Sequence, residues 1–321
     1  MLNENMYLTR TTAGNSLLSI EDSEVNNGTF EAFINYIDAK PKTVATYTRA
    51  IKQFASYLEA NGITQPTQQD IRAYRDSIKD THKPATVQAY IFAVRRFFSF
   101  TESSGIYPNV AGKIKGAKID RSPKKDYLTS EQAKQVLKSI DTSTIQGIRD
   151  YAILLLMITC GLRDIEVSRA NIEDMRTAGN NSVLYIQGKG KDERNDYVIL
   201  PAQTEEAIRR YLLKAGKNKQ TGDKPIFTST SNNSNGQRLT TRSISGIVKA
   251  TLRANGYDSD HLTAHSLRHT AITLALIANG GNIQEAQEFA RHANISTTQI
   301  YAHNLDKTKN SCSRLVASSL F

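Results

Sequence analysis

The sequence predicts a mainly α-helical protein of two domains, with a small antiparallel sheet that makes the second domain α+β. The first observation is length, because 321 residues exceed one ordinary domain and suit two. The second is the helical spacing of apolar residues, which holds from about Thr29 to Ser103 and resumes at Leu128. The third is a change of period, since residues 182–200 have the pattern of two strands around a glycine-containing turn.

The composition indicates a folded chain with a large positive charge. Apolar residues make up 39% and charged residues 22%, and the formal net charge is +10. Such a charge favours a polyanionic partner, nucleic acid before an anionic membrane. No run of about 18 apolar residues and no secretory signal is visible, so we expect no membrane partner. With only Cys160 and Cys312, we expect no disulfide framework and a reducing, cytoplasmic location.

Residues 28–110 are expected to form the first domain, a compact all-α module of four amphipathic helices. The first helix carries the apolar side chains of FEAFINYI, and Thr43 and Thr67 are the expected caps of the second and third. Pro84 suits the first turn of the fourth. The aromatic residues recur at helical spacing, so we interpret them as core rather than as a base-stacking surface. Residues 1–27 are polar without sustained periodicity and are interpreted as a flexible tail.

Residues 111–126 are expected to link the two domains. After Val110 this stretch contains six basic residues against two acidic ones, together with glycine and proline. A solvated tether is one interpretation. Because the whole chain is basic, we favour the other, in which the linker lies as a strap along a phosphate backbone.

Residues 127–321 are expected to form the second domain. Thr129 and Gln132 make a capping box at its first helix, and helices continue to Gly161. The strands SVLYIQ and ERNDYVIL then form a hairpin around the turn GKGKD. An apolar pattern after Leu305 predicts a last helix. A short helix is expected near residues 164–169, before the hairpin, and further helices are expected after it, near residues 203–215, 240–255, 264–279, 282–290 and 296–302.

Cationic side chains recur at helix ends and turns of the second domain. Arg163 follows TCGL, and Lys189 lies in the hairpin turn. His265 and Arg268 stand three apart, so they share a helix face. Phosphoryl transfer needs positive donors around the phosphate oxygens and an in-line nucleophile, and the arginine fork binds two oxygens at once. Taken singly, these residues also fit surface ion pairs, a basic turn or packing roles.

A metal site is not expected. His265 and His269 lie four apart, a spacing that can bind zinc on one helix face. No glutamate follows His265 in the HExxH arrangement, however, and Arg268 places a cation between the two rings. The sequence also lacks a Walker loop and an acidic metal cluster, so we expect no cofactor.

Four segments in order, GLRDIE, GKGKDER, HSLRHT and RHANISTTQIYAH, resemble the active-site boxes of the tyrosine recombinase (phage integrase) family. The resemblance extends from about residue 29 to the C-terminus and is to the simple Xer- or Cre-like type. It implies that the helical first domain is a core-binding domain for DNA and that the second is catalytic, ending in an oligomerisation helix. Docking of that helix on its own protomer or on a neighbour is left open.

The resemblance implies how the scissile phosphate is held. Arg163 and Arg268 would be the two clamping arginines, and His292 would hydrogen-bond the same phosphate. Glu166 would support the box of the first arginine. His269, at a position where histidine is common in the family, would give structural support.

The resemblance also implies how the strand is cut. Tyr301 would be the nucleophile, Lys189 the general acid for the leaving 5′ oxygen, and His265 the group that transfers a proton. A phenol has a pKa near 10, so it needs a cationic pocket or a base to attack at neutral pH. Lys191 is a second candidate for the general acid. Arg291 stands where the family often has glycine, so an altered loop or an added phosphate contact is expected there.

The expected function is site-specific DNA recombination through a 3′-phosphotyrosyl intermediate and a Holliday junction. The expected partners are double-stranded DNA with inverted-repeat sites and a homo-tetramer in the synapse, while a second recombinase or accessory factor is left open. Integration or excision of a mobile element, inversion and dimer resolution are all compatible. Two alternatives are a non-catalytic DNA-binding protein on the same fold and a type IB topoisomerase, which works as a monomer without a second site.

Overall fold

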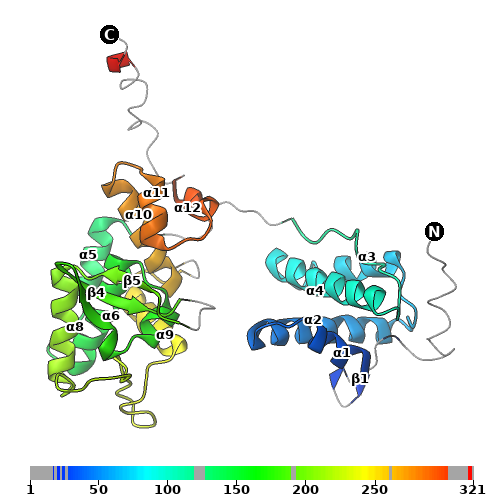
Figure 1. Ribbon diagram of the computed structural model, residues 1–321, viewed down its shortest axis with the longest axis horizontal. Helices are drawn as coiled ribbons and strands as arrows, with labels where there is room; N and C mark the ends of the chain where they lie inside the picture. Colours follow the sequence, from blue (N-terminus) through cyan, green and yellow to red (C-terminus); the bar gives the residue numbers. More distant parts are fainter. Residues whose placement is uncertain are drawn as a thin grey trace. The chain divides into compact units, whose positions relative to one another are not determined.

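The protein is mainly helical with one small three-stranded sheet, which confirms the predicted fold class (Figure 1). Its contacts divide it into two compact units, Met1–Asp120 and Arg121–Phe321, and each is described by itself. The structure is a computed structural model, and it describes residues 17, 20–21, 24–25, 28–118, 127–188, 193–259, 262–302 and 317–319.

The described part of the first unit contains four helices, as the apolar spacing predicted. Thr67 caps the third helix and forms a reciprocal capping box with Asp70, so this start is confirmed. Pro84 begins the fourth helix, also as predicted. The expected cap at Thr43 is wrong, because the second helix already begins at Pro41, whose missing N–H suits a first helical turn. The helices are α1 (Gly28–Tyr36), α2 (Pro41–Ala60), α3 (Gln68–Ser77) and α4 (Pro84–Ser103).

Aromatic rings fill the core of the first unit. Phe33 and Phe97 meet edge to face, with ring centroids 5.4 Å apart, and Phe54 lies 5.0 Å from the Tyr74 ring. All four side chains are fully buried. These four rings are therefore core, as interpreted from the sequence, and they are not available to stack on bases, while Tyr36 and Phe92 of the same helices are exposed.

Both ends of the first unit depart from the interpretation of the sequence. In the stretch interpreted as a tail, Leu17 is buried in the core, and strands β1 (Ile20–Glu21) and β2 (Glu24–Val25) pair antiparallel. At the other end, Ala111 and Ile114 are buried in the same core although they were placed in the linker. The basic residues around Ala111 and Ile114 gave this stretch the composition of a linker, but the two buried side chains show that the first unit extends past Ala111.

The second unit contains the predicted hairpin and one strand more. Strands β4 (Asn181–Ile186) and β5 (Asp196–Ile199) pair antiparallel, as expected. Strand β3 (Met175–Ala178) adds to the other edge of β4 through a two-residue turn at Gly179, where φ is 58°. The sequence MRTA has no period-two apolar pattern, which is why β3 was not predicted. A short 3₁₀ turn, η2 (Ile172–Asp174), leads into it.

The described part of the second unit contains eight helices besides this sheet. The predicted cap at Thr129 is confirmed, since its side chain accepts a backbone N–H bond at the helix start, and Asn282 caps its helix in the same way. The helices are α5 (Ser130–Lys138), α6 (Ile145–Cys160), α7 (Asp164–Arg169), α8 (Ala202–Lys214), α9 (Thr241–Ala254), α10 (Ala264–Ala278), α11 (Ile283–Ala290) and α12 (Ile295–Ala302).

The apolar helix α6 runs through the main core of the second unit, and α10 packs beside it. Helices α10, α11 and α12 form a smaller cluster of their own, drawn in orange in Figure 1. Ile272, Leu276 and Ala290 are fully buried there, next to Tyr301. This cluster fixes α12 and its tyrosine against the start of α10.

The helix predicted after Leu305 lies outside the described residues, apart from the helical residues 317–319. Within the described ranges, none of the helices is both long and apolar enough to cross a membrane.

Candidate active site

The turn after α6 brings the first predicted arginine into place. Helix α6 ends at Cys160, and Gly161 follows in the left-handed conformation with φ of 61°. A Cβ at Gly161 would lie 3.1 Å from the Phe289 ring, so both the backbone and the space favour glycine. Arg163 is the N-cap of α7, which starts at once.

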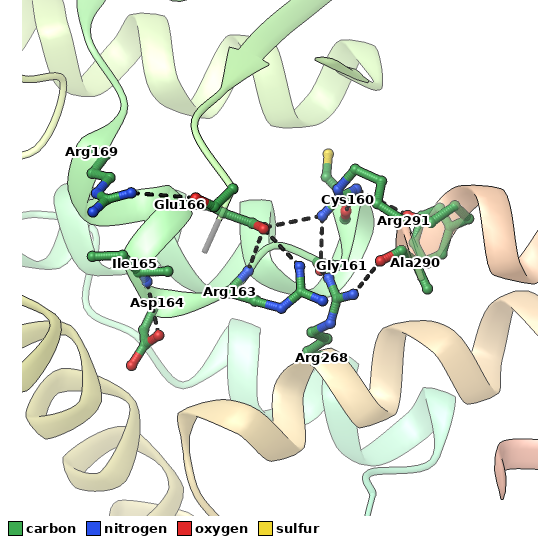
Figure 2. A network of polar contacts seen from close by, with 12 residues as sticks. Cys160, Gly161, Arg163, Asp164, Ile165, Glu166, Arg169, Arg268, Ala290 and Arg291 are labelled. Carbon is green, nitrogen blue, oxygen red and sulfur yellow. Dashed lines mark hydrogen bonds and ion pairs between the residues drawn. The ribbon is translucent and has the colours of Figure 1, made fainter. Parts of the chain in front are cut away.

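Glu166 lies between two guanidinium groups (Figure 2). Its Oε1 accepts from Nη1 of Arg163 at 2.8 Å, and its Oε2 accepts from the Arg163 backbone N–H at 2.9 Å and from Nη2 of Arg291 at 3.1 Å. The carboxylate is 1% exposed. Burial raises its pKa, but the charge of Arg291 and the contacts of Arg163 outweigh this and lower the pKa below its usual value. Glu166 is therefore ionised and orients both arginines.

Arg268 is 1% exposed and lies at the meeting point of two helix ends. Its Nη1 donates to the carbonyl of Gly161, after α6, and its Nη2 donates to the carbonyl of Ala290, the last residue of α11. These carbonyls carry the negative end of each helix dipole. Burial and the charges of Arg163 and Arg291 lower the pKa of Arg268 to about 9. The guanidinium is thus a desolvated cation, which interacts strongly with any anion that reaches it.

Tyr301 projects from α12 among histidine rings. Its side chain is 5% exposed, and its ring centroid lies 4.5 Å from that of His269 and 6.0 Å from that of His292. His265, one turn before His269 on α10, is exposed, and its ring lies 5.6 Å from the His269 ring. Burial raises the pKa of the phenol, although Arg268 and Arg163 lower it in part. The phenol is therefore protonated at neutral pH.

His292 is held by the helix that carries the tyrosine. Its Nδ1 lies 3.0 Å from the hydroxyl of Thr298, a fully buried residue of α12. Burial, followed by the charges of Arg268, Arg163 and Arg291, lowers the pKa of His292 to about 4. The ring is therefore neutral at neutral pH, and one of its two nitrogens can donate a hydrogen bond.

Six of the predicted site residues come together. Arg163, Arg268, His292 and Tyr301 share one electrostatic environment, with Glu166 behind the arginines and His269 under the phenol ring. His265 lies at the exposed edge of this group.

Lys189 and Lys191 lie outside the described residues. The preceding residue, Gly188, accepts a 3.3 Å hydrogen bond from Arg169 of α7. Across the described ranges, no group of three or more His, Cys, Asp or Glu side chains could hold a metal ion.

Two contributions to the site were not predicted from the sequence. Thr298 reaches His292, and Arg291 turns its side chain inward to Glu166. The segment HANISTTQIYAH contains two adjacent threonines, and only the helix register shows which one is buried. Arg291 was noticed as a departure from the family, but the direction of its side chain depends on the fold.

Two family sequence profiles match this chain, each over a different segment. That of the phage integrase family matches residues 126–308, and that of the phage integrase N-terminal SAM-like domain matches residues 30–105. The chain belongs to the phage integrase family. The resemblance found in the four motifs is confirmed.

Curated tyrosine recombinases are similar to this phage integrase family member over different lengths. XerC of Pelobacter propionicus is 30% identical over 279 residues, which cover 83% of this chain and 86% of that protein. XerC of Caldanaerobacter subterraneus is 34% identical, over 55% of this chain and 47% of that protein. A tyrosine recombinase of Synechococcus elongatus is 30% identical, over 64% of this chain and 63% of that protein. The match thus spans between about half and two thirds of the last two relatives.

Solved structures share the fold of this family member. The XerH site-specific recombinase bound to a palindromic difH substrate, in a post-cleavage complex, superposes with a TM-score of 0.72 at 20% identity, over 90% of this chain and 84% of that one. The Tn1549 transposon integrase in complex with a circular intermediate DNA gives a TM-score of 0.68 at 17% identity, over 91% and 98%.

Proposed function

We propose that this phage integrase family member is a site-specific DNA recombinase, which cuts and rejoins duplex DNA through a 3′-phosphotyrosyl intermediate. One observation carries the proposal: two guanidinium groups and the rings of His269 and His292 surround one buried phenol, Tyr301. A desolvated group of cations beside a nucleophile is the arrangement that phosphoryl transfer requires.

The arginines hold the phosphate in this scheme. Arg163 and Arg268 offer guanidinium N–H groups to the non-bridging oxygens, and neutral His292 donates a further hydrogen bond. Because the helix ends and Glu166 fix both guanidinium groups before DNA arrives, little reorganisation accompanies the reaction.

The bond exchange in the proposed reaction balances without a cofactor. The Tyr301 oxygen forms a bond to phosphorus, the bond from phosphorus to the 5′ oxygen breaks, and Lys189 gives that oxygen a proton. The phenol is protonated in the free protein, so a base must take its proton, and His265 is assigned this role. A phosphodiester is exchanged for a phosphotyrosyl ester of similar energy, so rejoining needs no ATP.

The proposed substrate is double-stranded DNA with inverted-repeat sites, bound by pairs of protomers that form a tetramer in the synapse. The solved relatives include a recombinase on its difH substrate and a transposon integrase with transposon right-end DNA, which supports a DNA substrate here. The net charge of +10 indicates that phosphate contacts dominate, so affinity should fall steeply with salt. We also propose a cytoplasmic location, on the basis of the two cysteines.

A two-site assay tests the function itself. Two labelled duplexes of different length, each carrying DNA that flanks the gene of this protein, are incubated with the full chain. A recombinase yields two new duplexes whose lengths identify exchanged arms. Relaxation of supercoiled DNA without exchanged arms would indicate a topoisomerase, and sequence-specific binding with neither product would indicate a non-catalytic DNA-binding protein.

A second assay tests the assignment of Lys189. Lys189→Ala should slow cleavage of ordinary DNA strongly and cleavage of a substrate with a 5′-thiolate leaving group much less, because a thiolate leaves without a proton. Lys191→Ala, the second candidate in the same turn, is measured on both substrates, and a loss confined to ordinary DNA in that variant would assign the general-acid role to Lys191 instead. An equal loss on both substrates would remove Lys189 from the general-acid role.

A further inference from the structure

Arg291 occupies a backbone conformation that normally favours glycine. It ends α11 with φ of 53°, in the left-handed region. In the described part of the chain, Asp38 is the one other non-glycine residue with a positive φ. A side chain in this conformation costs conformational energy, because Cβ approaches the following carbonyl. An arginine here calls for a compensating interaction of its side chain.

The side chain makes four hydrogen bonds, all directed into the protein (Figure 2). Nη1 donates to the carbonyls of Phe289 at 2.9 Å and Cys160 at 3.4 Å. Nη2 donates to the carbonyl of Gly161 at 3.3 Å and to Oε2 of Glu166 at 3.1 Å. The guanidinium group therefore joins the end of α11 to the end of α6 and the start of α7.

These contacts exclude one of the two roles expected for Arg291. The four N–H donors of its two terminal nitrogens are all used inside the protein, and its Nε is buried. The side chain is 10% exposed. Arg291 consequently has no free terminal N–H to offer to a DNA phosphate, whereas Nη1 and Nη2 of Arg268 each donate one bond to a carbonyl and keep a second N–H.

We infer that Arg291 is a positioning residue, which ties the turn leading to His292 and Tyr301 to the turn that carries Arg163, through Glu166. The inference rests on the proposed active site. Oε1 of Glu166 accepts a hydrogen bond from the Arg163 side chain, and Oε2 accepts from the Arg163 backbone N–H and from the Arg291 side chain. One anion thereby sets the distance between the phosphate clamp and the nucleophile segment, and a small misplacement of reacting groups has a large effect on rate.

The charge of Arg291 supports the same role. Glu166 faces Arg163 from α7, Arg268 from α10 and Arg291 from the end of α11. Without Arg291 the pKa of Glu166 rises, because burial is then opposed by fewer cations. The pKa of His292 rises as well, since one of the like charges around it is lost while Arg268, Arg163 and His265 remain.

Three substitutions separate the backbone from the side chain. Arg291→Gly and Arg291→Asn both suit the left-handed conformation but remove the guanidinium. Arg291→Lys keeps the charge and loses the fork. The measured quantity is the single-turnover rate of covalent adduct formation on a nicked duplex that traps the adduct, at saturating protein, from pH 5 to 9. The affinity for the same duplex is measured separately. Arg253→Ala, an exposed arginine of α9, controls for the loss of one positive charge.

We expect the glycine and asparagine variants to cleave about 10- to 100-fold more slowly at neutral pH, with affinity within about twofold of the wild type. The lysine variant should be intermediate. The acid limb of the rate profile should move to higher pH in the glycine and asparagine variants and much less in the lysine variant, because lysine keeps the positive charge near His292.

Wild-type rates and an unmoved profile in both the glycine and asparagine variants would overturn the inference. Weaker binding with an unchanged rate at saturation would overturn it in favour of a phosphate contact. A failure of the proposed active site looks different, because the wild type would then bind the duplex and form no adduct in any of these experiments.

Discussion

In the second unit, helices α6 and α11 both end in a left-handed turn, α6 at a residue without a side chain and α11 at a residue with a long, charged side chain. The turn after α6 uses Gly161, with φ of 61°, and the turn after α11 uses Arg291, with φ of 53°. They face each other, because the Phe289 ring fills the space beside Gly161 and Arg291 donates to the Gly161 carbonyl. Each turn leads directly to a proposed active-site residue, Arg163 in one and His292 in the other.

The difference shows that a left-handed turn can be occupied for two distinct reasons. Glycine is favoured at 161 because the backbone is left-handed and a Cβ would lie 3.1 Å from the Phe289 ring. Arginine is accepted at 291 because its side chain binds two helix ends and a buried carboxylate. Because Gly161 has no side chain, the Phe289 ring packs beside it, and Arg291 donates to its carbonyl. Arg268 donates to a carbonyl of each turn and so depends on both.

The largest effect is expected where the two turns meet, at Arg268. Arg268→Lys keeps a cation but loses the planar guanidinium, whose two separate nitrogens bind the Gly161 and Ala290 carbonyls and keep N–H groups for a phosphate. We expect adduct formation to slow by about 10²- to 10³-fold, as for the loss of one oriented donor at a reacting centre. Single-turnover cleavage measures this effect. Arg253→Lys on the exposed face of α9 is the control, and an equal loss in both variants would contradict a specific role for Arg268.

The carboxylate that bridges the two turns should dominate their stability. Glu166→Gln leaves Arg163 and Arg291 facing a neutral amide, which should cost about 3 kcal/mol of unfolding free energy at pH 7. Urea unfolding, followed by the loss of helical circular dichroism, measures the difference in unfolding free energy. The control is Glu205→Gln, whose partner Arg209 is 66% exposed and should contribute under about 1 kcal/mol.

The pH dependence follows from the lowered pKa of Glu166. A lowered folded-state pKa gives stability that is present above the unfolded-state pKa, about 4.3, and is lost as the pH falls through the folded-state pKa. The stability difference between wild type and Glu166→Gln should therefore shrink below about pH 4. A difference that stays constant down to pH 3 would show that the charge of Glu166 is not what stabilises the turns.

The glycine turn should respond to a single methyl group. Gly161→Ala adds the cost of the left-handed conformation, about 1 kcal/mol, and a clash with Phe289. Gly179→Ala is a matched control, because Gly179 has φ of 58° and open space around its Cβ position. Thermal or urea unfolding should show a larger loss at 161 than at 179. Equal losses would mean that the conformation alone, and not the facing turn, selects glycine at 161.

The smallest effect is expected at Thr298, which acts on the second turn only. Thr298→Val keeps the shape of a buried side chain and removes the hydroxyl 3.0 Å from His292 Nδ1. Loss of one such hydrogen bond corresponds to about 1 kcal/mol, so cleavage should slow about fivefold. Thr297→Val, on the exposed side of the same helix turn, is the control. Equal rates in wild type and Thr298→Val would show that His292 needs no partner on α12.

The two turns also show how far the sequence predicts this molecule. Gly161 after an apolar run marks a helix end, and the capping signals at Thr67 and Thr129 place other helices correctly. The end of α11 at Arg291 has no such signal. Long-range partners have none either, because the neighbours of Arg291 at Cys160 and Gly161 are about 130 positions away in the chain.

Local patterns failed where a short segment depends on its neighbours. Strand β3 is held by pairing with β4, and Ala111 and Ile114 are anchored by a core assembled from other helices. The candidate catalytic residues came from motif resemblance and not from periodicity. Only the fold shows that Arg268 is buried against two helix ends while His265 stays exposed.

The central claim is that these turns assemble a pocket in which Tyr301 attacks DNA. Covalent capture tests it most directly: wild type and Tyr301→Phe are incubated with labelled duplex from the flanks of the gene and quenched in detergent. The account predicts a DNA-linked protein band for the wild type that is absent in Tyr301→Phe, with unchanged site binding. A band that persists in Tyr301→Phe would place the nucleophile elsewhere and contradict the account.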